Sequence, residues 1–311
     1  MKLFGSDRIT NIMDKMNFAE GEVIQHPWVT KSLERAQSKV EQNNFSIRKR
    51  QLEYDDVLNN QRKVVYARRR HALLGDRLSG DIYNMLYELI ESIVEDHYRD
   101  AEYEAIQEKM LRMLATDAQI DREKWSGLGQ DGLVEMLVNH CLEVYKNKTR
   151  ILSEPFYRIL KQIQEGDVPN KPTSVQVIFN DGVKRMRVVV DVETALQNEG
   201  KELVHAMERA AVLSVIDDKW MEHLRELDSV KEGIGLRAFG QKDPLLEYKR
   251  EAFNMFTELV AEINQEVISM IWKAMPEGAN DQQQLTREKA PVKRKIDMSK
   301  LRTQHDEMPN M

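Results

Sequence analysis

The chain has 311 residues, a length that suits about two domains. Its 46 basic and 52 acidic residues give a formal net charge of −6, which argues against a general nucleic-acid coat, although local basic patches remain open. A charged fraction of 32% with 7% aromatic residues, 14 glycines and 8 prolines favours long solvated helices over a β-sandwich.

Cysteine usage and hydropathy indicate the compartment. Cys141 is the single cysteine, so the chain cannot form an intramolecular disulfide or a cysteine-rich zinc site. No run of about 18 apolar residues occurs, and the first residues have no apolar segment of signal-peptide length. We expect a cytoplasmic protein that could still lie on a membrane surface.

A very long helix is expected at residues 26–74, after a short segment, 1–25, with too few apolar residues for a core of its own. Pro27 suits a first helical turn and Gly75 suits a C-terminal cap, with no glycine or proline from Val29 to Leu74. Such a helix is about 70 Å long. Apolar positions recur every seven residues (Leu33, Val40, Ile47, Tyr54), but polar residues interrupt the stripe, which predicts a spine for several elements rather than a dimeric coiled coil.

The next region reads as helical up to about residue 164. Helical periodicity covers Asp81 to Leu114 and returns from Leu133 to Gln164, where Pro155 predicts a bend. Residues 125–129 read as a loop and residues 166–173 as a turn-rich break. Alternating apolar residues on both sides of Asn180-Asp181-Gly182 then predict a β-hairpin over 174–192, the only convincing β-structure in the sequence.

Two further long helices follow, over 201–230 and 246–272. A short glycine-containing loop joins them, which is typical of an antiparallel helical hairpin. Residues after Pro276 are polar and without period, which predicts a disordered tail over 276–311. The expected fold class is therefore mainly α, with one β-hairpin.

Motifs for chemistry are missing from the sequence. It has no phosphate-binding glycine loop of the P-loop type, no dinucleotide-binding glycine motif and no paired-histidine zinc motif. His140 beside Cys141 lacks a second ligand pair, so a packing or surface role is favoured over a metal site. Asp55-Asp56 and Asp217-Asp218 point about 100° apart on helices, so ion pairs are favoured over a shared site.

Basic clusters on the long helix, Arg48-Lys-Arg50 and Arg68-Arg-Arg70, could bind phosphates. Acidic residues nearby make a solvated or ion-paired helix face the commoner outcome.

The loop between the last two helices leaves two interpretations open. An exposed Phe239 beside Arg237, Gln241 and Lys242 would indicate a binding site. Alternatively, Leu236 and Phe239 fold under the loop as a structural cap.

Three ordered stretches resemble one family. They are His26-Pro-Trp-Val-Thr-Lys to Glu41, Asn44-Phe-Ser-Ile-Arg-Lys to Arg62, and Trp220-Met-Glu-His-Leu through Gly233-Ile-Gly-Leu-Arg to Glu251. Together they resemble the SecA motors of bacterial preprotein translocation, over about residues 1–273. The hairpin at 174–192 is an extension relative to the shorter SecA pattern.

The resemblance implies a domain order. Residues 1–25 would be a remnant of the second nucleotide-binding motor domain, with the motor sequence itself, the preprotein cross-linking domain and the zinc tail missing. Residues 26–74 would be the scaffold helix, 75–200 a helical wing with the hairpin 174–192, 201–275 the two-helix finger and 276–311 a disordered tail.

The resemblance also implies a function. The chain would be the scaffold, wing and finger part of an ATP-driven translocase, coupling ATP hydrolysis in the motor to movement of an unfolded preprotein through the SecYEG channel. The expected contact residues at the finger tip are Leu236, Arg237, Phe239, Gln241 and Lys242, where Phe239 matches a bulky position that is often tyrosine. No catalytic or metal-ligating residue is expected.

Partners and location follow from the same resemblance. We expect contacts with the channel, the preprotein, the motor domains and an anionic membrane surface, at the cytoplasmic face of the inner membrane, and no nucleic acid. ATP and magnesium belong to the parent family, and no cofactor or ATPase activity is expected of this chain alone. The alternative is a free-standing helical scaffold that binds a nucleic acid or acidic partner through its basic clusters.

Overall fold

The computed structural model describes residues 27–75, 77–98, 102–118, 122–166, 171–234 and 243–277. The predictions for segment 1–25 and for nearly all of the tail 276–311 lie outside these residues. In the part described, helices predominate and strands are few, so the expected mainly α class with a β-hairpin and an antiparallel helical hairpin is confirmed. None of the described helices is both long and apolar enough to cross a lipid bilayer.

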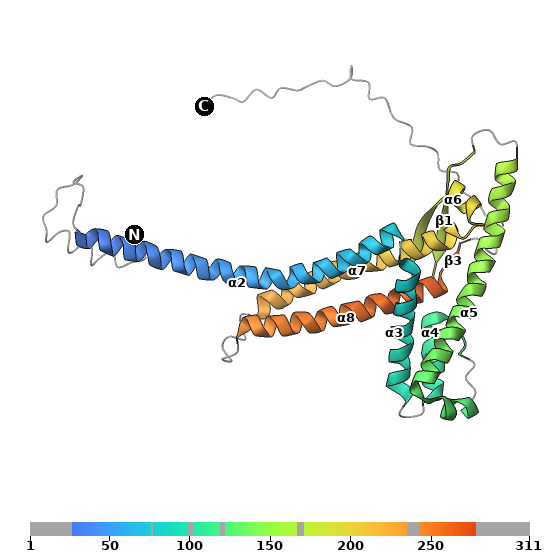
Figure 1. The fold of residues 1–311 in the computed structure, drawn as a ribbon, viewed down its shortest axis with the longest axis horizontal. Helices are drawn as coiled ribbons and strands as arrows, with labels where there is room; N and C mark the ends of the chain where they lie inside the picture. Colours follow the sequence, from blue (N-terminus) through green and yellow to red (C-terminus); the bar gives the residue numbers. More distant parts are fainter. Residues whose placement is uncertain are drawn as a thin grey trace, which may run out of the picture. The chain divides into compact units, whose positions relative to one another are not determined.

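The long helix α2 runs from Pro27 to Leu74, close to the predicted limits (Figure 1). It ends as the sequence predicts: Gly75 has a φ of 75°, and its N–H donates to the carbonyl oxygen of His71 at 2.9 Å. That left-handed conformation is the one glycine adopts without strain at a helix C-terminus.

The chain divides into two compact units, which we describe separately. Unit 1 comprises the described parts of residues 1–68 and 219–260, and unit 2 those of residues 69–218 and 261–311. Helix α2 and the two helices of the predicted hairpin, α7 (Glu202–Ile234) and α8 (Pro244–Lys273), contribute residues to both units.

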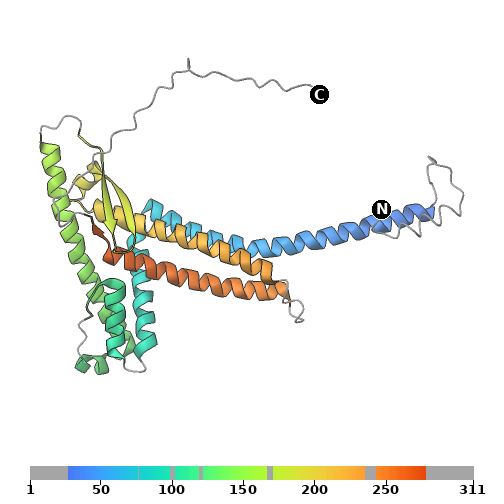
Figure 2. The ribbon, with the colours of Figure 1, turned by 180° about the vertical axis from the view of Figure 1, so that it is seen from behind.

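Within unit 1, the end of α7 and the start of α8 pack as an antiparallel pair with α2 alongside (Figures 1 and 2). Their shared core contains four buried residues, Leu227, Ile234, Tyr248 and Ala252. Half-buried residues pack around it, three of them from α2. Removal of these apolar side chains from water stabilises the assembly of three helices that would be marginal alone.

Unit 2 contains the helices α3 (Leu78–Tyr98), α4 (Tyr103–Leu114) and α5 (Arg122–Glu165). Two expectations need correction here. The region expected to be helical from 81 to 114 is divided into α3 and α4. Residues 125–129 were expected to form a loop, but α5 already includes them, and its backbone leaves helical geometry at Gly129, with φ 70° and ψ 172°. A glycine adopts these angles without a Cβ clash, so a single residue interrupts the helix where the sequence suggested a longer loop. Pro155 lies inside α5, and the bend expected there stays a prediction.

The sheet of unit 2 has the order β2-β1-β3. Strands β1 (Ser174–Asn180) and β2 (Arg185–Asp191) pair antiparallel as predicted, with Val177 opposite Val188. Asp191 then caps the short helix α6 (Val192–Gln197) by accepting from the Thr194 N–H at 2.8 Å, which lowers the pKa of its carboxyl group. Strand β3 (Met275–Pro276) adds to β1 and was not predicted.

A half-buried lysine of α5 holds the C-terminal end of α8. The Lys148 ammonium donates to the carbonyl oxygens of Ile271 at 2.8 Å and Trp272 at 2.7 Å, two groups that a helix end leaves without partners. Tyr145 stacks on Trp272, with ring centroids 4.5 Å apart. Burial lowers the pKa of Lys148 to about 7, while the two carbonyl oxygens favour its charged form.

Candidate functional site at the two-helix hairpin

The predicted contact residues, Leu236, Arg237, Phe239, Gln241 and Lys242, lie outside the described residues. Their role therefore stays a prediction. The structure does describe both helices that lead to them: α7 ends at Ile234 and α8 begins at Pro244. Asp243 caps α8 by accepting from the Leu245 N–H at 3.0 Å. The structure thus defines the helices on both sides of the predicted contact residues.

Two tyrosines attach the α7–α8 hairpin to α2 near the start of α8. Tyr54 of α2 and the buried Tyr248 of α8 contact each other, with ring centroids 4.9 Å apart. Lys231 of α7 adds an ion pair to Asp55 of α2 at 3.2 Å. Burial, together with the carboxylates of Asp228 and Asp55, raises the pKa of Tyr248 to about 12. Its hydroxyl therefore stays protonated in neutral solution.

A buried chain of hydrogen bonds connects all three helices of unit 1. The side-chain amide of Gln61 on α2 donates to the Ala252 carbonyl oxygen on α8 at 2.8 Å. The Gln61 Oε1 lies 3.0 Å from Nε2 of His223 on α7. Because this oxygen can only accept, Nε2 carries the proton and His223 donates. A buried polar chain of this kind specifies one register between helices, since any slip leaves its groups unsatisfied.

Aromatic rings enclose His223. Trp220 stacks on it with centroids 5.5 Å apart, and Phe256 lies at 6.1 Å on a tilt. Burial lowers the pKa of His223, because the charged imidazolium would lose its hydration among these rings. The neutral form is therefore the one that fits this site.

Our sequence analysis did not single out Gln61 and His223 for this role. A signal exists for Gln61: it lies seven residues after Tyr54 and so continues the apolar repeat of α2 with a polar side chain. A polar residue at a core position of a helical repeat is a known specifier of register. His223 offers no comparable signal, because its burial depends on which helix packs against it.

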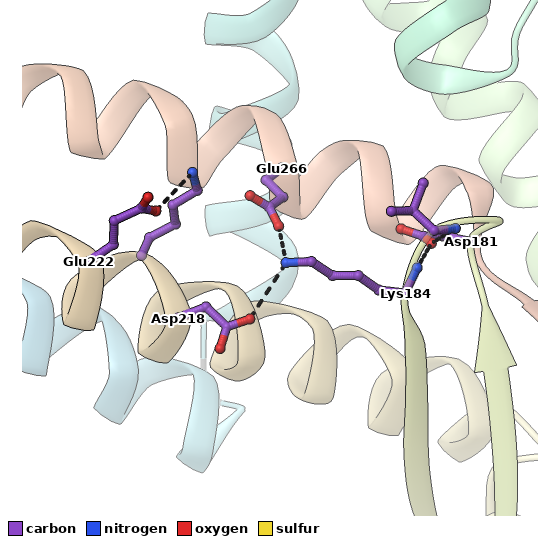
Figure 3. Close-up of polar contacts among 7 residues, drawn as sticks. Asp181, Lys184, Asp218, Glu222 and Glu266 are labelled. Atoms are coloured by element: carbon purple, nitrogen blue, oxygen red, sulfur yellow. Dashed lines mark hydrogen bonds and ion pairs between the residues drawn. The ribbon is translucent and has the colours of Figure 1, made fainter.

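Of the paired carboxylates, Asp55, Asp217 and Asp218 form ion pairs, as expected. Asp217 pairs with Arg69 at 2.9 Å. Lys184, at the end of the β-hairpin turn, reaches Glu266 of α8 at 2.5 Å and Asp218 of α7 at 3.5 Å (Figure 3). The hydrogen bond to Glu266 is the main cause that raises the pKa of Lys184. Asp181 organises the same turn by accepting from the N–H groups of Val183 and Lys184.

The other residues singled out in the sequence, a cysteine, a histidine and two basic clusters, have the following surroundings. Cys141 is fully buried, and burial raises the pKa of its thiol to about 12, so the reactive thiolate is disfavoured. His140 Nε2 lies 2.8 Å from the Asp117 carbonyl oxygen. Residues 48–50 are exposed, whereas Arg69 of the second basic cluster is used in an ion pair. Nothing in these contacts favours a nucleic-acid interface.

Comparison with known proteins identifies the family. The model of the SecA Wing and Scaffold domain matches residues 23–275. The chain is 49% identical to the protein translocase subunit SecA of Salinibacter ruber over 306 residues, which are 98% of this chain and 26% of that protein. It is 42% identical to SecA of Flavobacterium psychrophilum, with 92% of this chain and 26% of the relative covered, and 40% identical to SecA of Bacteroides thetaiotaomicron, with 97% and 27% covered. The chain thus spans about a quarter of the length of these relatives. With its long helix, its helical and β-hairpin region and its antiparallel helix pair, the chain belongs to the SecA family and carries that family's wing and scaffold domain.

Proposed function

We propose that this chain is the mechanical part of an ATP-driven protein translocase. In this proposal α2 transmits movements of nucleotide-binding motor domains to the α7–α8 hairpin. The hairpin tip then acts on an unfolded preprotein at the mouth of the SecYEG channel, at the cytoplasmic membrane surface. The relatives named above are translocase subunits, and the family match covers the whole of α2, α7 and α8.

The observation that carries the proposal is the contrast along α2. Its residues 54–68 are attached to the hairpin through Tyr54, Asp55 and Gln61. Its residues 30–53 include no buried side chain, although several are large and apolar, namely Leu33, Val40, Phe45, Ile47 and Leu52. A helix that is attached at one end and presents an apolar stripe at the other is suited to couple two bodies.

The tip supplies the proposed contact with substrate. In sequence, Phe239 lies between the end of α7 and the start of α8, with Arg237 and Lys242 nearby. An aromatic ring with neighbouring cations can hold an extended polypeptide without reading its sequence, because the ring contact is not directional. This chemistry suits a translocase, whose substrates share no sequence.

A chimera tests the proposal directly. The matching quarter of Salinibacter ruber SecA would be replaced by this chain, and ATP-dependent transport of an unfolded secretory protein into SecYEG vesicles would be measured. We expect transport to be supported. Phe239→Ala should lower transport about tenfold or more, as for loss of a central contact residue. Phe239→Tyr should be tolerated, because the ring remains.

Controls separate the tip from general damage. In the chain alone, Phe239→Ala should change the free energy of unfolding by no more than about 0.5 kcal/mol, as at an exposed site. The chain alone should show no ATP turnover. A lower melting temperature for Phe239→Ala with normal transport would identify the ring as a structural cap and would refute its assignment to substrate contact.

A further inference from the structure

Unit 2 contains a cavity that the proposed function does not use. It has a volume of about 700 Å³ and lies between one face of α5 and the turn that joins α6 to α7. This volume is within the range of about 300–1,000 Å³ that is usual for small-molecule sites. From α5 come Lys146, Arg150, Ser153 and Tyr157, which are spaced three or four residues apart and so share one face of the helix.

The wall opposite α5 is held in place by a close backbone approach. Gly200 has a φ of 82°, and a Cβ atom at this position would lie 2.5 Å from the Ser153 carbonyl oxygen. No other residue fits there without displacing the turn. Two hydrogen bonds fix the turn itself: Gly200 N–H to the Ala195 carbonyl oxygen at 2.7 Å, and Glu202 N–H to Asn198 Oδ1 at 3.0 Å. The cavity is therefore formed before any ligand arrives.

The charges around the cavity favour a small anion. Three cationic side chains, Lys146, Arg150 and Lys201, have no ion-pair partner among the residues that the structure describes. Arg158 in the same lining is paired with Glu154 at 3.7 Å. Two further carboxylates, Glu143 and Glu199, also line the cavity and would repel a long polyanion. One compact oxyanion can approach the three cations without this penalty.

Ser153 provides an independent indication. The side chain is 5% exposed, and its Oγ has no hydrogen-bond partner within the described parts of the chain. Buried polar atoms nearly always have a partner, so an unpaired hydroxyl in a cavity lining indicates an absent one. A serine hydroxyl can rotate to donate to an oxyanion, and the half-buried Tyr157 beside it offers an apolar surface for the rest of a ligand.

We propose that this cavity binds a small ligand with one oxyanion group, a phosphate monoester or a carboxylate, and an apolar body. Lys146, Arg150 and Lys201 hold the oxyanion, Ser153 donates to it, and the body lies against Tyr157. The site is in the wing, so the ligand adds to the proposed transport function and takes no part in ATP hydrolysis.

Calorimetric titration of the 311-residue chain with phenyl phosphate and with benzoate tests this site. These probes share the ring and differ in the oxyanion, so their affinities show whether the site prefers a phosphate monoester or a carboxylate. We expect saturable binding of at least one probe, with one ligand per chain. Arg150→Gln and Lys201→Gln should each weaken it about tenfold, the loss expected when a charge-assisted contact is removed. Ser153→Ala should weaken it by a smaller factor without changing the stoichiometry.

Lys161→Gln is the matched control, because Lys161 lies on α5 outside the lining and pairs with Glu165. It should leave the affinity unchanged. Absence of saturable binding for both probes would overturn the proposal. So would an equal loss in Lys161→Gln and Arg150→Gln, which would indicate attraction to the general charge of the helix. A circular dichroism melt of each variant checks that the unit remains folded.

Discussion

The two parts of α2 that belong to unit 1 differ in surroundings although they continue one helix. Residues 30–53 place Phe45 and Leu52 in solvent, with 63% and 64% of their surfaces exposed. Residues 54–68 bury Gln61 and Val65, which are 7% and 3% exposed. The heptad spacing of apolar residues runs through both parts. The difference shows that the repeat marks which face of the helix can be buried, while the partner decides where it is buried.

The comparison also shows where polar groups carry specificity. In the attached part a single glutamine contacts both hairpin helices, through His223 and the Ala252 carbonyl oxygen. In the exposed part, glutamines such as Gln51 are exposed to solvent. The same side chain therefore has a structural role only where helices exclude water from it.

The largest effect is expected at Trp220 of α7, beside the histidine that bonds to the attached part of α2. Trp220 is 6% exposed and stacks on His223, so Trp220→Ala removes a large buried ring and leaves a cavity. We expect a loss of about 3–5 kcal/mol in the free energy of unfolding, measured by urea melts. A loss below about 1 kcal/mol would show that the ring is not part of the support of the hairpin.

A glutamine pair sharpens the comparison. Gln61→Ala leaves the His223 N–H without a partner in a buried site and removes the added contact to the Ala252 carbonyl oxygen, which should cost about 1–3 kcal/mol. Gln51→Ala, the same change on the exposed part of the helix, should stay within about 0.5 kcal/mol. Both are measured by urea melts. Equal effects would mean that the buried chain of hydrogen bonds contributes nothing specific.

The third prediction concerns pH. The folded state holds the pKa of His223 below its ordinary value of 6.5, so the unfolded chain takes up a proton more readily. The free energy of unfolding should therefore fall as the pH drops below about 6.5. His223→Gln can still donate to Gln61 but does not titrate. The pH dependence should be smaller in this variant than in the original chain, and equal slopes in both would contradict the role of His223.

The smallest effect is expected from the exposed stripe. Phe45→Ala in the chain alone should change the free energy of unfolding by no more than about 0.5 kcal/mol. In the Salinibacter chimera the same change should destabilise the protein more, because the proposed function has the motor domains cover this face. Melting curves of both proteins give the answer. An equally small effect in the chimera would show that nothing packs on Phe45.

Short-range chemistry made much of the fold predictable. Pro27 and Gly75 mark the ends of α2, and the Asp-Gly turn with alternating valines marks the β-hairpin, because capping and strand alternation involve residues close in the chain. The prediction of a loop at 125–129 failed because a single residue, Gly129, interrupts the helix there. Prediction also failed where a short strand depends on a distant partner, as for β3, which pairs with β1 across about a third of the chain.

The candidate site also has a part that was predicted from sequence and a part that depends on contacts between distant residues. Phe239 and its neighbours were predicted from sequence alone, through their position between two helices and the family resemblance, and their role stays a prediction. Gln61, His223 and the Lys184 contacts to Asp218 and Glu266 join residues far apart in the chain. By itself, the sequence determined the helices, the hairpin turn and the family. Only the tertiary structure decided which polar side chains are buried together, because burial depends on the segments that exclude water from them, and those lie beyond the reach of local periodicity.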